Sequence, residues 1–131
     1  MFKKIFNRKK EQNNLNIITQ EIENLFLIKA FVNQEMAAMI KCVIKEDRTI
    51  YIGDIDYQSS KYYNKGYGSA MMKKLIEYAE ENKYVELYGD LSVVDLDHKD
   101  RLHHFYNKFD FVITEYPERK DMFYGEIRRK I

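Results

Sequence analysis

The sequence predicts a mixed α/β domain in which helices pack on a central sheet. Apolar runs between residues 25 and 57, separated by short polar turns, are typical of an antiparallel meander. Two later segments place apolar residues at helical spacing. The chain has 131 residues, enough for one core but not for two, and it contains no linker or internal repeat. We therefore expect one domain with the order β-β-β-loop-α-β-α-β-β.

The first half of the chain is expected to form strands. Residues 15–23 are ambiguous between strand and helix, because Ile17, Ile18 and Ile22 fit neither period cleanly. Three strands are then predicted at residues 25–32, 36–45 and 49–57, joined by turns at residues 33–35 and 46–48. Short connections favour antiparallel pairing between these strands.

The second half alternates helices and strands. Residues 69–81 predict a helix with a broad apolar stripe, and residues 84–88 a strand. The crossover rule makes that strand parallel to residues 49–57. A second helix is expected to start at Asp97 or His98, with Leu102, Phe105, Tyr106 and Phe109 along one stripe. Strands at residues 111–116 and 122–127, joined by a turn at 117–121, are expected to close the sheet.

Composition excludes several classes of protein. The charged residues nearly balance, with a formal net charge of +1, which gives no reason to expect nucleic acid or an anionic membrane as partner. Cys42 is the single cysteine and is expected in the core, so no disulfide within the chain and no cysteine-rich zinc site is expected. We expect residues 1–14 to form a basic arm or helix, followed by one domain at residues 15–131. The basic residues resemble the start of a signal peptide, but the apolar run that a signal peptide requires does not follow them, so we expect a cytoplasmic protein.

A glycine-bearing loop precedes the first predicted helix. Gly66 and Gly68 leave room for an anion near backbone N–H groups at the helix N-terminus, and Lys65 adds a cation. Alone, this pattern also fits a plain tight turn. Neither a dinucleotide fingerprint nor a Walker loop is present, because Met71 stands where the third glycine would be and Lys65 precedes the glycines.

Two segments resemble motifs of the GNAT acyltransferases. The segment Tyr62-Tyr63-Asn64-Lys65-Gly66-Tyr67-Gly68-Ser69-Ala70-Met71-Met72 resembles motif A, Q/R-x-x-G-x-G/A, and His103-His104-Phe105-Tyr106-Asn107-Lys108-Phe109-Asp110-Phe111 resembles motif B. With the preceding meander, the resemblance covers residues 25–116. It implies a mixed, mostly antiparallel sheet with a V-shaped splay between two parallel strands, residues 49–57 and 84–88.

The resemblance implies acetyl-CoA as cosubstrate, with no metal. The expected binding residues are Tyr57, Gln58, Tyr63, Asn64, Lys65, Gly66, Tyr67, Gly68, Ser69 and Ala70. Some positions depart from the family pattern: Tyr63 stands where Arg or Gln is usual, Asp110 where Gly is usual, and Lys99 where Asn is frequent. The two helices that usually lie between the first two strands, and that shape the acceptor pocket in the family, have no room here.

Transfer of an acetyl group to an amine requires a base and an acid. Tyr106 matches the family's general acid, with core packing as the alternative. Asp54 and Asp56 are the candidate bases, since alternation puts them on one face with Ile50 and Ile52, and surface solvation is the alternative for each. Glu86 and Asp90, on the next strand, are the carboxylates expected to lie next nearest to the reacting atoms. A backbone N–H near Tyr57 or Gln58 is expected to stabilise the oxyanion.

The expected function is acetyl-CoA-dependent N-acetylation of a primary amine on a small molecule or peptide. Two alternatives stay open: an inactive GNAT-like CoA-binding or regulatory module, and a partner-binding domain that uses the basic arm. The spacing of His98, His103 and His104 favours solvent-facing or capping roles over metal binding. No nucleic acid or membrane partner is expected, and a homodimer is an open alternative.

Overall fold

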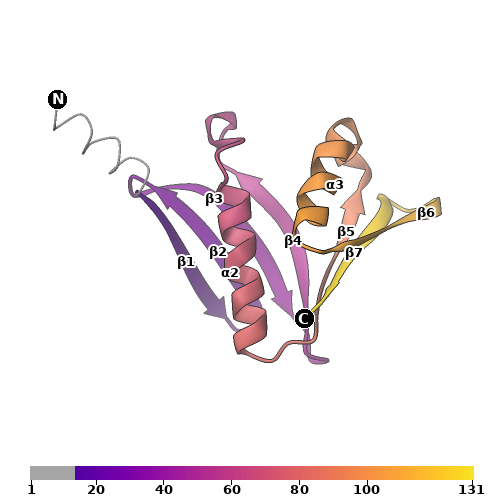
Figure 1. Ribbon diagram of the computed structural model, residues 1–131, viewed down its shortest axis with the longest axis horizontal. Coiled ribbons are helices and arrows are strands. Elements are labelled where there is room, and N and C mark those ends of the chain that lie inside the picture. The colour runs from indigo at the N-terminus through magenta and orange to yellow at the C-terminus, as the bar shows by residue number, and fades with distance from the viewer. Residues whose placement is uncertain (1–13) are drawn as a thin grey trace.

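The first four strands form an antiparallel meander, one strand more than the three that the sequence predicts (Figure 1). The computed structural model describes residues 14–131, so residues 1–13 of the predicted basic arm lie outside the described residues. The strands are β1 (Leu15–Ile22), β2 (Leu25–Val32), β3 (Glu35–Ile44) and β4 (Thr49–Tyr57). The ambiguous segment at residues 15–23 is thus a strand, because its odd-numbered residues can join the core side of the sheet opposite Phe26, Ile28 and Ala30.

Helices and strands then alternate to complete the sheet. The short 3-10 turn η1 (Ser60–Tyr62) leads to helix α2 (Tyr67–Glu81) and strand β5 (Glu86–Ser92). A second 3-10 segment, η2 (Val93–His98), precedes helix α3 (Lys99–Lys108), and β6 (Val112–Lys120) and β7 (Phe123–Lys130) form the closing hairpin. The seven strands lie in the order β1-β2-β3-β4-β5-β7-β6, with β4 and β5 parallel as predicted.

Several predicted boundaries are wrong, most of them by one or two residues. Strand β5 begins at Glu86 because residues 82–85 end helix α2, with Lys83 left-handed at φ 63° and the Tyr84 N–H bonded to the Ala79 carbonyl. It continues through Gly89, where a side chain would come within 3.0 Å of the Ile52 carbonyl oxygen. The closing turn is also shorter than predicted.

Pro117 lies inside strand β6 and not in a turn. It is tolerated there because β6 is at the edge of the sheet, and the regular pairing with β7 is interrupted between Glu115 and Lys120. The tight turn instead follows Lys120, with Asp121 in the left-handed region at φ 60°. Helix α2 starts two residues before the predicted Ser69.

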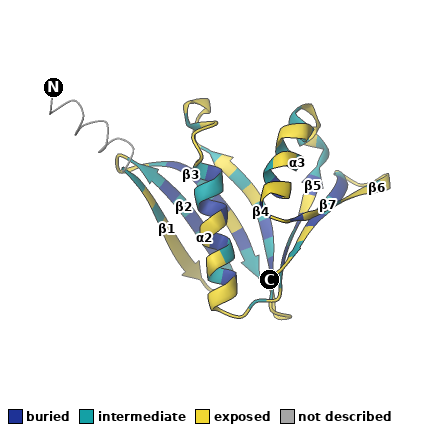
Figure 2. Cartoon of the chain, in the orientation of Figure 1, coloured by how far each residue is buried: buried dark blue, intermediate teal, exposed yellow. Residues whose placement is uncertain are grey.

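Both helices cover the same face of the sheet, and the core lies between them and the strands (Figures 1 and 2). Met71, Met72, Leu75 and Ala79 of α2 are buried there, as the apolar stripe predicts, and so is Cys42 of β3. Burial raises the pKa of the Cys42 thiol to about 12. We call the opposite side of the sheet the open face, because no helix among residues 14–131 covers it; Leu27, Met39, Tyr51 and Tyr88 are among its half-buried residues.

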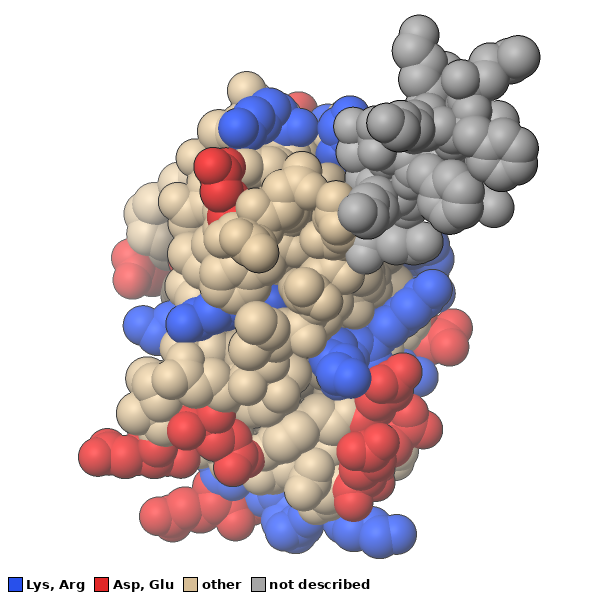
Figure 3. Space-filling view, turned by 90° about the vertical axis from the view of Figure 1, so that its left-hand side faces the viewer, with Lys and Arg blue, Asp and Glu red and all other residues tan. Residues whose placement is uncertain are grey.

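Charged side chains of both signs are interspersed on the side of the molecule seen in Figure 3, in keeping with the formal net charge of +1. None of the helices formed by residues 14–131 is long and apolar enough to cross a membrane.

Candidate functional site

The two central parallel strands separate halfway along their length. Strands β4 and β5 pair from Thr49↔Glu86 to Ile52↔Gly89, and beyond these residues they no longer pair (Figure 1). The predicted V-shaped splay is therefore confirmed. Facing strand edges without a partner leave backbone N–H and C=O groups available to another molecule.

A β-bulge in β4 marks the start of the splay. The register with β3 shifts there: Cys42 opposes Ile52 but Ile40 opposes Ile55, so β4 holds one extra residue. Gly53 suits this place because a Cβ on it would lie 2.9 Å from the Lys41 carbonyl oxygen. A bulge bends its strand, which helps β4 to turn away from β5.

The bulge changes the orientation of the two candidate bases. Ile55 and Ile52 face the core side together, whereas Asp56 opposes Met39 on the open face and is exposed. The expectation that Asp56 shares a face with Ile50 and Ile52 is therefore wrong, because simple alternation does not allow for the extra residue. Asp54 lies within the bulge, exposed, at the point where the strands part.

The start of helix α2 has no capping side chain. Gly66 occupies the N-cap position with φ 83°, a left-handed conformation that favours glycine, and no side chain caps the helix. The first intrahelical bond runs from the Ala70 N–H to the Gly66 carbonyl, at 3.0 Å. The N–H groups before Ala70 thus lack intrahelical partners and point toward the loop. Asn64 and Lys65 are exposed in this loop.

Tyr57, at the end of β4, reaches over this helix start. Its hydroxyl lies 2.7 Å from where a Cβ on Gly68 would be, and Tyr63 packs edge-on against its ring with centroids 5.2 Å apart. Burial raises the pKa of Tyr57, the Gly68 N–H opposes this shift, and Tyr63 adds to it. Tyr63, at the position where the family has Arg or Gln, therefore supports Tyr57 and supplies no cation.

A cation comes to the same place from helix α3. The Lys108 Nζ donates to the Ser69 Oγ at 2.7 Å, and the Lys108 ammonium lies over the rings of Phe105 and Phe109. The Phe105 ring also packs 3.5 Å from where a Cβ on Gly68 would be. Lys108 was not among the predicted binding residues, although it belongs to the motif B segment; its approach to α2 depends on how the helices pack.

Tyr106 lies at the centre of the core that joins α3 to the sheet. It is 7% exposed, with Phe105 and Phe111 edge-on at 5.4 Å. Its pKa is raised by burial first, then by the negative charges of Asp95 and Asp54. Core packing, the alternative to the acid role for this residue, is therefore what the structure shows, and the acid role stays a prediction.

The predicted oxyanion donor needs a correction at Gln58. The Gln58 N–H donates to the Ala37 carbonyl at 2.9 Å, so it is already used within the sheet. Tyr57 opposes Ala38 across the β3–β4 ladder. The better-placed donors are backbone N–H groups of β4 between Ile52 and Tyr57, where the partner strand β5 has moved away.

A tyrosine–carboxylate pair spans the last paired rungs of β4 and β5. The Tyr51 hydroxyl donates to Asp90 Oδ2 at 2.6 Å, and the Tyr51 ring packs edge-on against Tyr88 at 5.3 Å. Burial first, and then Asp90 and Asp54, raise the pKa of Tyr51. Asp90 is among the carboxylates that the sequence analysis names, but its bond to Tyr51 depends on how β4 and β5 pair, which no local pattern reveals.

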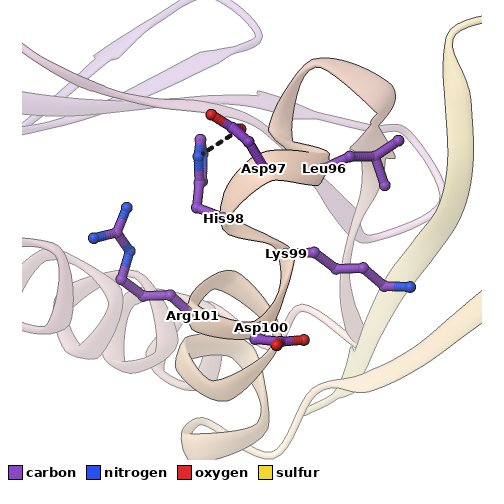
Figure 4. Close-up of a pocket in the computed structure, with 6 residues that line it drawn as sticks. All are labelled: Leu96, Asp97, His98, Lys99, Asp100 and Arg101. Atoms are coloured by element: carbon purple, nitrogen blue, oxygen red, sulfur yellow. Dashed lines mark ion pairs between the residues drawn. The ribbon is translucent and has the colours of Figure 1, made fainter.

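The histidines do not form a cluster. His98 is the N-cap residue of α3 and pairs with Asp95 and Asp97, His103 bonds the Tyr124 hydroxyl at 2.9 Å, and His104 is exposed. A surface hollow at the η2–α3 junction is lined by residues 96–101, including the Asp97–His98 pair, and by none of the predicted site residues (Figure 4). Within residues 14–131, no three metal-ligating side chains lie close enough to share an ion.

Comparison with known proteins identifies the family. Residues 2–111 match the model of the acetyltransferase (GNAT) family. This chain therefore belongs to the GNAT family of acetyltransferases. It is also 38% identical over 68 residues to YocC, an uncharacterized protein of Bacillus subtilis, covering 52% of this chain. The matched region spans 39% of the length of that relative.

Solved structures share the fold. A GNAT family acetyltransferase from Elizabethkingia anophelis, with acetyl-CoA bound, superposes with a TM-score of 0.70 at 16% identity, covering 91% of this chain and 99% of that one. An acetyltransferase of Bacillus subtilis in complex with CoA gives 0.65 at 15% identity, with 87% and 95% covered. A GNAT acetyltransferase from Streptococcus pneumoniae gives 0.66 at 20% identity, with 97% and 73% covered.

Proposed function

We propose that this chain is an N-acetyltransferase that transfers the acetyl group of acetyl-CoA directly to an amine bound at the splay of β4 and β5. The observation that carries the proposal is the convergence of three features in one place. A glycine-lined helix start, strand edges without partners and the side chain of Tyr106 all lie where β4, α2 and α3 meet. Family membership agrees with this proposal.

The residues present fit the diphosphate of CoA. The first turn of α2 offers backbone N–H groups with no capping side chain, and Gly66 and Gly68 keep their approach free of side chains. Lys108, held at Ser69, supplies a positive charge beside them. The backbone of β4 beyond Ile52 can pair with the amides of the pantetheine arm, as an added strand would.

Asp54 is the better of the two candidate bases. Asp54 stands in the bulge where the strands part, and its charge contributes to raising the pKa of both Tyr51 and Tyr106. Asp56 is exposed opposite Met39 and further along the strand. An alkyl ammonium with a pKa of about 10.4 must lose a proton before its nitrogen can attack, and Asp54 can pass that proton to water.

Tyr106 completes the exchange of protons. As the amine nitrogen bonds to the acetyl carbon and the carbon–sulfur bond breaks, Tyr106 gives its hydroxyl proton to the sulfur. The second proton of the nitrogen restores the hydroxyl through solvent. The products are an amide, the free CoA thiol and one proton released to water. Because burial raises the pKa of Tyr106, its hydroxyl is protonated and ready to donate at neutral pH.

A second candidate is a CoA-binding module that transfers nothing. It is favoured by the hydroxyl of Tyr57, which lies against Gly68 at the helix start, and by Tyr63, which replaces a family cation with a ring that packs on Tyr57. In this reading the Tyr57 ring would have to move aside before a diphosphate could reach all the amides of the helix start.

Thiol release from acetyl-CoA across a panel of amines, alongside calorimetric binding of acetyl-CoA, distinguishes the two candidates. For an enzyme, Tyr106→Phe should lower kcat by about 100-fold with little change in the dissociation constant for acetyl-CoA. Tyr84→Phe, which removes a hydroxyl on a ring that packs with Tyr78 and Arg48, is the matched control and should keep the wild-type rate. Binding without thiol release from any amine would favour the module.

A further inference from the structure

The two edges of the sheet differ in how they are protected from pairing with another strand. Strands β1 and β6 form these edges, at opposite margins of the sheet (Figure 1). Strand β6 holds four charged residues and Pro117, which has no N–H to donate, and its ladder with β7 is interrupted between Glu115 and Lys120. Proline, charge and irregular pairing are features that keep an edge strand from adding a further strand.

Strand β1 has almost none of these features. It pairs with β2 over its full length without a register shift, and it contains neither proline nor a basic residue. Glu21 is its one charged residue, and residues 16–20 are all uncharged. The side chains of Ile18 and Ile22 are 49% and 46% exposed. A long, regular and mostly uncharged edge of this kind favours pairing with another strand.

The backbone groups that point outward from β1 alternate along the strand. The Asn33 N–H donates to the Asn14 carbonyl at 3.4 Å, so these two residues form a hydrogen-bonded pair of the β1–β2 ladder. Because such pairs alternate with non-hydrogen-bonded pairs, the even-numbered residues of β1 direct their N–H and C=O groups at β2. Those of the odd-numbered residues between 15 and 21 point outward, and no other strand formed by residues 14–131 pairs with them.

A second copy of β1 fits this edge. When two β1 strands pair antiparallel about a two-fold axis at Ile18, the outward groups of Ile17 meet those of the partner's Thr19, so the hydrogen-bonding positions match. Ile18 then faces the partner's Ile18 in a non-hydrogen-bonded pair, where side chains approach most closely. Asn16 faces the partner's Gln20, and their amide groups can hydrogen-bond.

This register also keeps like charges apart. Leu15 opposes the partner's Glu21, so the two Glu21 side chains lie at opposite ends of the pair. Asn14 lies beside the partner's Glu21 and Glu23. The sequence that precedes Asn14, residues 1–13, holds five of the 22 basic residues and one of the 21 acidic residues, a formal charge of +4. The two sequences that meet at each end of the pair are therefore opposite in charge.

We infer that the chain forms a homodimer in which the β1 strands of two copies pair antiparallel about Ile18 and join the two sheets into one. The inference goes beyond the proposed function and does not depend on it. The splay of β4 and β5 lies three strands from β1 in the sheet, so the proposed site stays open in both copies. Because the other edge is protected at β6, the assembly closes as a dimer and does not grow into a longer sheet.

Sedimentation equilibrium at concentrations up to about 100 μM tests the dimer, because that range detects a Kd in the micromolar range. We expect the wild type to have twice the mass of one chain. Ile18→Lys should raise the dimer Kd by about tenfold or more, since two ammonium groups would face each other at the axis. Val112→Lys is the matched control: it introduces the same charge at an exposed position of the other edge strand and should keep the wild-type Kd.

Hydrogen exchange followed by NMR locates the contact. The N–H groups of Ile17 and Thr19 should exchange slowly in the wild type and rapidly in Ile18→Lys. The N–H of Gln20, which bonds to β2, should stay protected in both, and its protection also shows that the variant folds. A monomer with rapid exchange at Ile17 and Thr19 would overturn the inference. So would a monomer in which both are protected, which would assign this edge to another segment of the chain, or a dimer in which both exchange rapidly, which would place the contact elsewhere.

Discussion

The hydroxyl of Tyr57 lies 2.7 Å from the position that a Cβ on Gly68 would take. One side chain of β4 therefore fills the space that glycine leaves at the start of α2. The contact links the strand that leads into the splay with the helix that would hold the diphosphate. Stability and cosubstrate binding should consequently both depend on Gly68.

Gly68→Ala should destabilise the fold by about 1 kcal/mol, because the clash with Tyr57 outweighs the better helix propensity of alanine. It should also weaken acetyl-CoA binding by about tenfold, since the methyl group lies among the amides of the helix start. Urea denaturation and calorimetry measure the two effects.

The double variant Gly68→Ala/Tyr57→Phe controls for the clash. Removing the hydroxyl takes away the atom nearest the new methyl group, so stability should recover toward that of Tyr57→Phe alone. Acetyl-CoA affinity should stay low, because the methyl group is still present. Recovery of both quantities together would show that Gly68 matters only through Tyr57.

Lys108→Met should raise the KM for acetyl-CoA by about tenfold and leave kcat nearly unchanged, because the ammonium at Ser69 is lost while the apolar stem is kept. The KM of the wild type should rise with salt more steeply than that of the variant. Steady-state kinetics at two ionic strengths measure this. Lys74→Met, on an exposed part of α2, is the matched control; an equal rise in KM there would mean that only overall charge matters.

Periodicity was enough to predict most of this fold. Strands β2 and β4 have their predicted bounds, and the helical stripe of α2 is buried as expected, because burial on one face leaves a direct pattern in the residue types. Features without such a pattern were missed. The end of β5 was lost because Gly89 and Asp90 are typical of turns, and Gly89 is used there for close strand packing.

The site was predicted only where neighbouring residues in the sequence form it. The helix start at Gly66 and the position of Tyr106 follow from local motifs. The side of β4 on which Asp56 lies depends on a single extra residue, which alternation cannot reveal. Lys108 and Ser69 are 39 residues apart in the sequence, and so are Tyr51 and Asp90. Tertiary packing brings each of these pairs together, and no local sequence pattern encodes such a contact.

The pH profile of kcat should show no fall at alkaline pH caused by loss of the proton from Tyr106. Burial raises the pKa of Tyr106 above its ordinary value of about 10, so its hydroxyl keeps the proton that it must donate throughout the neutral and mildly alkaline range. We expect kcat to rise with pH as the amine deprotonates, and to show no fall up to about pH 10. Initial rates between pH 6 and that limit measure this. A fall in kcat that starts near pH 8 and disappears in Tyr106→Phe would contradict the raised pKa.

Asp110→Gly should stabilise the protein by about 1 kcal/mol. Asp110 follows helix α3 with a left-handed backbone at φ 66°, and this conformation is higher in free energy for a residue with a side chain than for glycine. The bonds that hold this helix end use only backbone atoms, from the Asp110 N–H to Asn107 and from the Phe111 N–H to Tyr106, so glycine preserves them. Tyr106 should therefore keep its position, and kcat should not change. Asp110→Ala removes the same carboxylate but keeps a Cβ, and it should not gain stability. Equal stabilisation by both substitutions, measured by urea denaturation, would attribute the gain to charge and not to the backbone.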